Sequence, residues 1–417
     1  MRTSLHFLRG SVVYALLTLS TVEAFADAPV FSGYGDLRLV LPSDDDDTWL
    51  EGGLGKNRFG DRDGGVELRF GEIVGEGRWQ VTPELFVMAG VRYDEDQRTK
   101  LDLIEAFVRY RPASTSQLRW SVTAGAFFPP ISLENGEAGW TSHWTLTPSA
   151  INTWVGEEFR TLGVEAKLEL RGAVDTFEAN AALFGWNDPA GFLIDVRGWA
   201  LHDRPTGLFD KVRLPDVFAH DLGLDHLTAS LFDEIDDRPG YYARAAWLSE
   251  GFGRIEVLRY DNRADPAAIG TVPAWRTEFW SAGLETQIEG VEILAQGMFG
   301  ETEVAPFGLF DRVVEYWSGY VLAGYAFNDQ WRVAARAELF GSDAVETDLI
   351  AGITFEEPEY SEHGYALTLA ATWTPLEWLR LTAEVLHIDS TRAQRDEIPL
   401  PPRLRERQLQ LGGRFIF

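Results

Sequence analysis

The chain has 417 residues and a formal net charge of −28 at pH 7, and it contains no cysteine. The missing cysteine excludes a disulfide framework and thiol chemistry. The strong negative charge excludes nucleic acid as a natural partner, because the phosphates would be repelled. Glycine contributes 40 residues and aromatic side chains 13% of the chain, a composition typical of β-barrels with tightly packed strands and aromatic girdles.

The first 26 residues have the three parts of a secretory signal peptide. Arg2 and Arg9 provide positive charge, residues 12–19 are a short apolar run, and Ala24-Phe-Ala26 supplies the small residues of a cleavage site. The apolar run is too short for a membrane-spanning helix. The sequence therefore predicts export to the periplasm, with residues 27–417 forming one mature domain.

Short turns and longer loops alternate along the mature chain. The short connections carry the Pro, Gly, Asn or Asp of tight turns and lie at 82–84, 112–117, 171–173, 249–251, 289–290, 328–330 and 375–377. The longer connections lie at about 42–63, 94–99, 128–159, 185–240, 261–274, 301–311, 341–361 and 388–404. They separate sixteen extended segments. This pattern predicts an all-β fold, a 16-stranded antiparallel transmembrane β-barrel of the bacterial outer membrane.

Most of these segments alternate apolar and polar residues, as a strand between lipid and water does. Residues 162–170 and 331–339 are clear examples, and in each the charges share one face. Because a charge facing lipid at mid-membrane costs about 2–4 kcal/mol, the charged face is expected to line the lumen. Residues 101–107 and 256–260 break the alternation, which predicts β-bulges. A soluble β-sandwich also alternates, but it has no reason to separate short from long connections.

The last ten residues resemble the closing strand of such a barrel. Leu409, Leu411, Gly413, Phe415 and Phe417 fall on one face, and the opposite face is mostly polar. An aromatic residue at the membrane interface is typical of these strands. Phe415 and Phe417 are therefore the predicted membrane-insertion signal for the barrel assembly machinery, and outer-membrane lipid and lipopolysaccharide are expected around the wall.

A sixteen-stranded barrel is wide enough for an aqueous channel, so the fold predicts passive diffusion of small hydrophilic solutes or ions. The loop at about 128–159 is expected to fold inward, and the outer loop at about 185–240 is long enough to form a lid. The predicted constriction residues are Glu134, Glu137, Glu157, Glu158, Trp140 and Trp144. The predicted basic residues of the lumen wall are Arg38, Arg69, Arg109, Arg119 and Arg336. Because the inward loop has no Lys or Arg, we expect a weakly cation-preferring or neutral-solute porin.

Residues 125–134 read Gly-Ala-Phe-Phe-Pro-Pro-Ile-Ser-Leu-Glu, and residues 154–165 read Trp-Val-Gly-Glu-Glu-Phe-Arg-Thr-Leu-Gly-Val-Glu. Together with residues 105–110, they resemble the porins of the phosphate-selective O and P type, in which a strand runs into a Pro-bearing loop that folds into the channel. The resemblance covers roughly residues 100–170 and implies a sixteen-stranded, homotrimeric porin. The basic constriction-loop residues of a phosphate channel are absent, so a phosphate- or anion-selective porin is the alternative.

Two functions from other classes stay open. His387, Asp389 and Ser390 offer the side chains of a hydrolase, but adjacent strand residues point to opposite faces, so no catalytic geometry is predicted and no enzyme is expected. The second alternative is a surface adhesin that acts through residues 185–240, and in this case the barrel is expected to be plugged. The acidic runs at 44–47 and 233–237 lack the spacing of a calcium-binding hand, and no metal ion or cofactor is expected.

Overall fold

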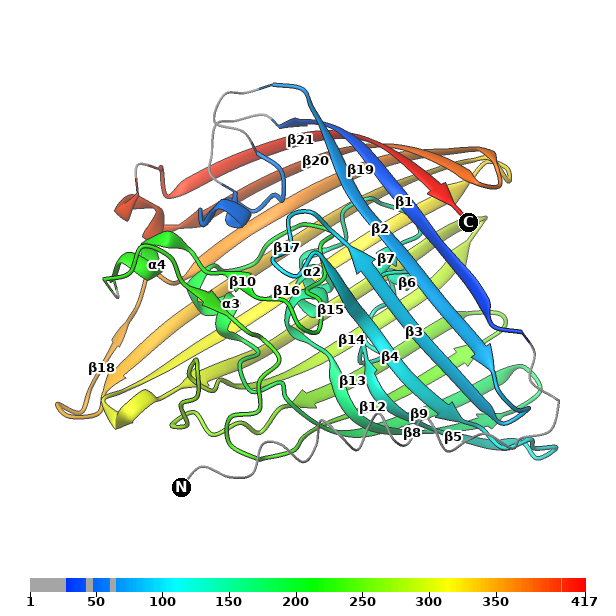
Figure 1. The fold of residues 1–417 in the computed structure, drawn as a ribbon, viewed down its shortest axis with the longest axis horizontal. Coiled ribbons are helices and arrows are strands. Elements are labelled where there is room, and N and C mark those ends of the chain that lie inside the picture. Colours follow the sequence, from blue (N-terminus) through cyan, green and yellow to red (C-terminus); the bar gives the residue numbers. More distant parts are fainter. Residues whose placement is uncertain (1–27, 43–47, 61–64, 222, 399) are drawn as a thin grey trace.

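The computed structural model describes residues 28–42, 48–60, 65–221, 223–398 and 400–417. The predicted signal peptide and the acidic run at 44–47 lie outside these residues. The largest sheet of the described residues is antiparallel and has 17 strands, and sixteen of them make the wall of a closed barrel (Figure 1). The predicted fold is therefore confirmed. Within the described residues, every helix is too short or too polar to cross a membrane.

The sixteen wall strands follow one another around the barrel in chain order. The first eight are β1 (Val30–Pro42), β2 (Glu67–Gln80), β3 (Leu85–Tyr93), β4 (Leu101–Tyr110), β5 (Leu118–Phe127), β8 (Thr161–Arg171), β9 (Asp175–Gly185) and β12 (Gly240–Ser249). The others are β13 (Gly253–Asp261), β14 (Arg276–Ile288), β15 (Val291–Val304), β16 (Phe310–Ala326), β17 (Trp331–Asp348), β19 (Glu362–Leu376), β20 (Leu379–Arg392) and β21 (Arg403–Ile416). β1 pairs with β21 and closes the cylinder, with Tyr34 opposite Ile416 and Leu41 opposite Leu409.

All seven predicted short turns connect neighbouring strands at one end of the barrel, which we call the turn end, and the longer connections lie at the other, the loop end. Three of the longer connections are shorter than predicted, because the strands around 301–311, 341–361 and 388–404 continue beyond the apolar band. Two of these extra residues, Glu301 and Asp343, belong to a row of carboxylates that lie opposite one another on adjacent strands, together with Glu278 and Glu315. Acidic, outward-facing strand ends were therefore mistaken for acidic loops. The short β18 (Ile353–Glu356) pairs with the end of β17.

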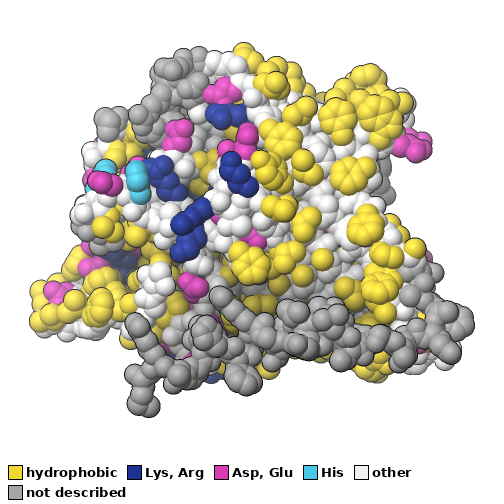
Figure 2. All heavy atoms as spheres, in the orientation of Figure 1, with side chains coloured by type: hydrophobic (Ala, Val, Ile, Leu, Met, Phe, Trp, Pro, Cys, Tyr) yellow, Lys and Arg dark blue, Asp and Glu magenta, His cyan; other side chains and the backbone are white. Residues whose placement is uncertain are grey.

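The outer wall is apolar, as a lipid-facing surface requires. Along β8 the outward residues Leu162, Val164, Leu168 and Leu170 are exposed, whereas Glu165 between them is buried inside. On the face shown in Figure 2, hydrophobic side chains gather over the part of the wall where β1 to β4 lie, and charged side chains gather toward the loops. Phe415 is also exposed on the outer wall, and Phe417 exchanges two backbone hydrogen bonds with Gly33.

One of the two predicted bulges is present and the other is wrong. The pairing of β3 with β4 shifts between Gly90 and Val91, opposite residues 103–105, which confirms the break in alternation at 101–107. Residues 256–260 pair without interruption on both sides. There Leu258 points inward and Arg259 outward, where Arg259 forms an ion pair of 2.7 Å with Glu278. The alternation is inverted because the lumen beside this strand is apolar.

Two loops supply that apolar lumen. The connection between β5 and β8, which we call the constriction loop, contains β6 (Asn135–Glu137), β7 (Thr141–Ser142) and α2 (Ala150–Glu158). The connection between β9 and β12, which we call the long inner loop, contains α3 (Phe192–Val196), β10 (Val212–Arg213), α4 (Asp216–Asp221) and β11 (Thr228–Ala229). Three single-turn helices, η1 (Trp49–Glu51), η2 (Pro306–Gly308) and η3 (Ala393–Glu397), lie in other connections at the loop end.

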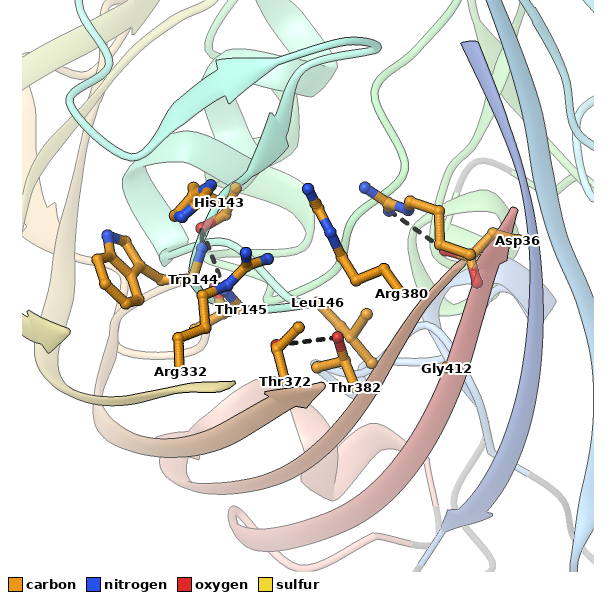
Figure 3. Close-up of a pocket in the computed structure, with 12 residues that line it drawn as sticks. Asp36, His143, Trp144, Thr145, Leu146, Arg332, Thr372, Arg380, Thr382 and Gly412 are labelled. Atoms are coloured by element: carbon orange, nitrogen blue, oxygen red, sulfur yellow. Dashed lines mark hydrogen bonds and ion pairs between the residues drawn. The ribbon is translucent and has the colours of Figure 1, made fainter. Parts of the chain in front are cut away.

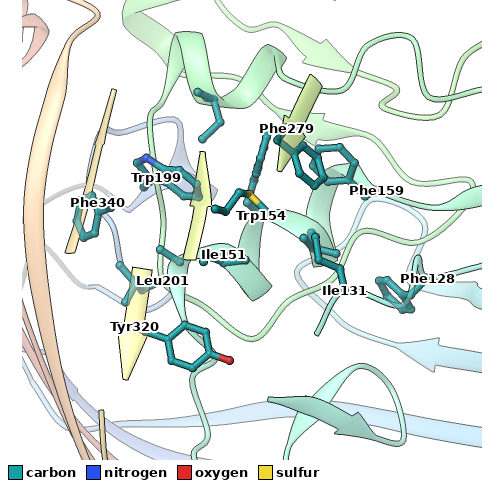
Figure 4. Packing of buried hydrophobic residues seen from close by; sticks show 14 of the residues in the cluster. Phe128, Ile131, Ile151, Trp154, Phe159, Trp199, Leu201, Phe279, Tyr320 and Phe340 are labelled. Atoms are coloured by element: carbon teal, nitrogen blue, oxygen red, sulfur yellow. The ribbon is translucent and has the colours of Figure 1, made fainter. Parts of the chain in front are cut away.

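The hydrophobic core lies inside the barrel, against β13 to β17 (Figure 4). Trp154 of α2 packs edge-on against Trp199 of the long inner loop, with ring centroids 5.5 Å apart, and against Tyr316 of the wall at 4.9 Å. The Trp199 indole donates a hydrogen bond of 3.0 Å to the Gly341 carbonyl. The long inner loop therefore enters the lumen, where the sequence suggested a lid above it.

Candidate functional site

The constriction loop is fixed to the wall by a buried guanidinium. Arg336 of β17 donates to Glu134 at 2.5 Å and to Glu338 at 2.9 Å. The same two carboxylates accept backbone N–H groups at the start of α2, from Ser149 at 2.9 Å and from Ala150 at 2.8 Å. The structure thus brings the predicted Glu134 and Arg336 together, in a buried cluster that anchors α2.

Glu157 and Glu158 tie the constriction loop to the long inner loop. Glu157 accepts two hydrogen bonds from Arg197, at 2.8 and 2.5 Å, and one of 2.9 Å from His202. Burial alone would raise the pKa of Glu157, but these two partners outweigh it and lower the pKa to about 2. Glu158 accepts backbone N–H groups of Gly191 and Leu193, and its burial raises its pKa to about 7.

A second buried ion cluster lies against β1 to β3. Arg38 forms ion pairs with Asp36 at 2.9 Å and with Asp203 of the long inner loop. Arg58, from the first outer connection, pairs with Asp94 at 3.0 Å and with the same Asp203 at 3.2 Å. The predicted lumen residue Arg38 therefore faces inward, but it clamps loops to the wall and does not contact the predicted glutamates.

The other predicted wall arginines lie apart from the constriction-loop glutamates. Arg69 forms an ion pair with Glu67 toward the loop end of β2. Arg119 of β5 lies opposite Glu169 in the pairing with β8. Arg109 donates to the Thr123 hydroxyl at 3.2 Å and faces a cavity in the lumen.

Both predicted tryptophans of the constriction loop are held in place. Trp140 stacks on Phe128 with ring centroids 3.8 Å apart, and its indole donates to the Asn152 carbonyl at 3.0 Å. Trp144 donates to Glu292 of β15 at 3.0 Å. Their packing fixes the path of the loop through the lumen, and neither indole N–H is left for a solute.

Glu137 is the one predicted constriction-loop glutamate that is not fully buried. It accepts a hydrogen bond of 2.6 Å from Arg380 of β20 and lies 2.8 Å from the ring nitrogen of His143. Its side chain is 28% exposed. Burial would raise the pKa of Glu137, but the hydrogen bonds from His143 and Arg380 outweigh it and lower the pKa to about 2. Glu137 is therefore ionised at neutral pH and bridges the loop tip to the wall.

A cavity of about 380 Å³ lies between the constriction loop and the wall of β2 to β8. Phe128 and Trp140 form part of its surface. Four carboxylates and two guanidinium groups contribute the charge: Glu76, Glu105, Glu137, Glu165, Arg78 and Arg109. Negative groups thus outnumber positive ones on this side of the loop.

A smaller cavity of about 10 Å³ lies on the other side of the loop, near the turn end (Figure 3). Arg332, Arg380 and Arg414 line it together with His143, and Asp36 is its single carboxylate. These three arginines were not among the predicted site residues. Each lies on the lumen face within three residues of the turn end of its strand, which is a signal that parity alone could have revealed.

The residues considered for other chemistry are not assembled into a site. His387 lies on the outer wall opposite Leu367, whereas Ser390 is buried inside and accepts a hydrogen bond from Arg395. Oxygens of Asp188, Glu234 and Asp236 in the long inner loop lie within 4.8 Å of one another. Backbone N–H groups of Ile235, Trp186 and Asp265 already donate to these carboxylates.

No family model matches the sequence, and no curated protein matches it. Among solved structures, the fold is similar to that of the outer membrane channel DcaP of Acinetobacter baumannii, with a TM-score of 0.54 and 10% identity over 95% of this chain and 99% of that one. OmpF of Salmonella typhi, in complex with daunomycin, is similar with a TM-score of 0.51 and 13% identity, over 93% of this chain and 97% of that one. The trimer form of OmpT of Vibrio cholerae, an outer membrane protein, is similar with a TM-score of 0.50 and 12% identity, over 94% of this chain and 100% of that one. These similarities show a porin-type fold, and the narrower resemblance to the O and P type stays a prediction.

Proposed function

We propose that the protein is an outer-membrane porin of narrow bore, through which small hydrophilic solutes diffuse passively. The observation that carries the proposal is the cavity of about 380 Å³ between the constriction loop and the wall, with its charged surface. An apolar outer wall and a charged inner cavity are the arrangement that a channel in lipid requires.

The bore is narrow because two loops fill much of the lumen, and the long inner loop also reaches the wall at β1, where Asp203 pairs with Arg38. Trp154, Trp199 and Ile151 are at most 1% exposed, packed against the inner face of β13 to β17. The remaining space lies beside β2 to β8, so the solute path is assigned to that side. Its surplus of carboxylates supports the predicted weak preference for cations or neutral solutes.

The same proposal places the mature chain in the outer membrane as a homotrimer, after export through the periplasm. The hydrophobic outer wall and the similarity to the trimer form of OmpT support it. Chemical crosslinking of the detergent-solubilised protein should give a trimer band, and a barrel that stays monomeric in detergent and in lipid would remove this part of the proposal.

The proposal is tested with the purified, refolded mature protein in planar lipid bilayers under a salt gradient. We expect discrete current steps and a reversal potential on the cation side. Membranes that stay silent while the barrel is folded, as judged by its heat-dependent migration on gels, would refute the channel. Current steps whose reversal potential indicates a preference for anions would refute the cation preference and leave the channel proposal in place.

A further inference from the structure

Three guanidinium groups are crowded on one patch of the lumen wall at the turn end. Arg380 of β20 lies directly opposite Arg414 of β21. Arg332 of β17 is separated from β20 by one strand, β19. It lies opposite Thr372 of β19, and Thr372 lies opposite Thr382, two residues from Arg380 on β20. Like charges directly opposite each other destabilise a sheet, so this arrangement favours an anion between them.

The carboxylates nearby satisfy only part of this charge. Arg380 is paired with Glu137 at 2.6 Å. Arg414 forms an ion pair of 3.2 Å with Asp36, and Asp36 also forms an ion pair with Arg38. The Arg332 side chain makes no ion pair and no hydrogen bond with any residue that the structure describes, and the Nε atoms of Arg332, Arg380 and Arg414 are all buried without a partner. Arg332 is therefore the one guanidinium of the three without a direct ion pair among the described residues, and Glu137, already paired with Arg380, is the carboxylate that acts on it.

The neighbouring contacts indicate which ligand fits. Both satisfied arginines hold a carboxylate, and guanidinium groups bind carboxylates through paired N–H donors. The space of about 10 Å³ is close to that of one water molecule. A carboxylate group therefore needs Arg332 to swing aside, and no hydrogen bond among the described residues prevents this.

We propose that Arg332, Arg380 and Arg414 form a binding site for a small carboxylate anion at the turn end of the lumen, an inference that rests on the channel function proposed above. The anion neutralises Arg332 and shares Arg380 with Glu137. Because Glu137 holds the tip of the constriction loop to β20, the anion and this tip compete for the same guanidinium group. The site thus gives the turn-end mouth an affinity for anions that the larger, acidic cavity lacks.

Calorimetric titration of sodium acetate into the detergent-solubilised barrel, at constant ionic strength, tests the site. Wild type should bind acetate saturably. Arg332→Gln should bind at least about 10-fold more weakly, the effect of losing one charged hydrogen-bonding partner, and it should fold normally because Arg332 has no bond to lose. Glu137→Gln should bind several-fold more tightly, because the competing carboxylate is gone.

Arg109→Gln is the matched control, since it removes the same charge from the other cavity. Its acetate affinity should equal that of wild type. Absence of saturable binding in wild type, or an equal loss in Arg332→Gln and Arg109→Gln, would overturn the site. The titration does not depend on conduction. If the protein binds acetate but gives no current in bilayers, the binding site stands and the channel is refuted. If it conducts ions but does not bind acetate, the channel stands and the binding site is refuted.

Discussion

Replacing Glu137 by glutamine should change the ion preference of the channel, because this side chain carries the carboxylate that bridges the lumen. It lines the larger cavity and pairs with Arg380 across the constriction-loop tip. Glutamine keeps the size of the side chain and removes its charge. The substitution therefore takes one negative charge from the solute path and leaves Arg380 without its counter-charge.

The size of the effect follows from the geometry. The pKa of Glu137 lies at about 2 instead of 4.5, and one pKa step corresponds to about 1.4 kcal/mol, so its partners favour the charged form by about 3 kcal/mol. A unit charge about 4 Å from a hydrated path contributes about 1 kcal/mol, with opposite sign for K⁺ and Cl⁻. The permeability ratio should then fall by up to about 30-fold, and by about 10-fold once salt screening is included.

The assay is the reversal potential of single channels under a tenfold KCl gradient. Glu137→Gln should move it toward the chloride equilibrium potential. Glu377→Gln is the matched control, because Glu377 lies exposed in the turn between β19 and β20 and should leave the ratio unchanged. A ratio that changes by less than about twofold in Glu137→Gln would place this residue outside the ion path and refute the reasoning.

Three further substitutions probe the packed loops. Arg336→Ala leaves Glu134 and Glu338 buried without their cation and should lower the free energy of unfolding by about 3–5 kcal/mol in urea titrations of tryptophan fluorescence; a loss below about 1 kcal/mol would contradict the buried cluster. Trp199→Ala should lower it by a similar amount, about 3–5 kcal/mol, and should also raise single-channel conductance, whereas an unchanged conductance would place Trp199 away from the bore. Glu157 has a pKa of about 2 instead of 4.5, so its contribution of about 3 kcal/mol is present above about pH 4.5 and is lost as the pH falls toward about 2. Thermal unfolding of Glu157→Gln should show a smaller loss over this pH range than wild type, and identical pH profiles would remove Glu157 from the clamp.

The sequence predicted the wall of the barrel better than its contents. Period-two alternation and the separation of short turns from long loops both follow from a strand that lies between lipid and water. This physics made the strand number and the closure of β1 on β21 predictable. It misled at the loop end of the barrel, because the strands there carry outward-facing carboxylates such as Glu301 and Asp343, which were predicted to lie in loops.

The lumen was harder to predict because its contacts join residues far apart in the chain. Glu157 meets Arg197 and Glu134 meets Arg336 only after two loops have folded inward. Nothing local distinguishes a glutamate that faces water from one that anchors a helix. The same cause explains Arg259, which faces outward because the lumen beside it is filled by an apolar core.

The conductance of single barrels in a planar bilayer tests the central claim most directly. Wild type should give small, discrete current steps, and Trp199→Ala should give larger ones, because the indole occupies space inside the barrel. Folded protein that inserts into the membrane and gives no steps with either chain would contradict a water-filled path through the lumen.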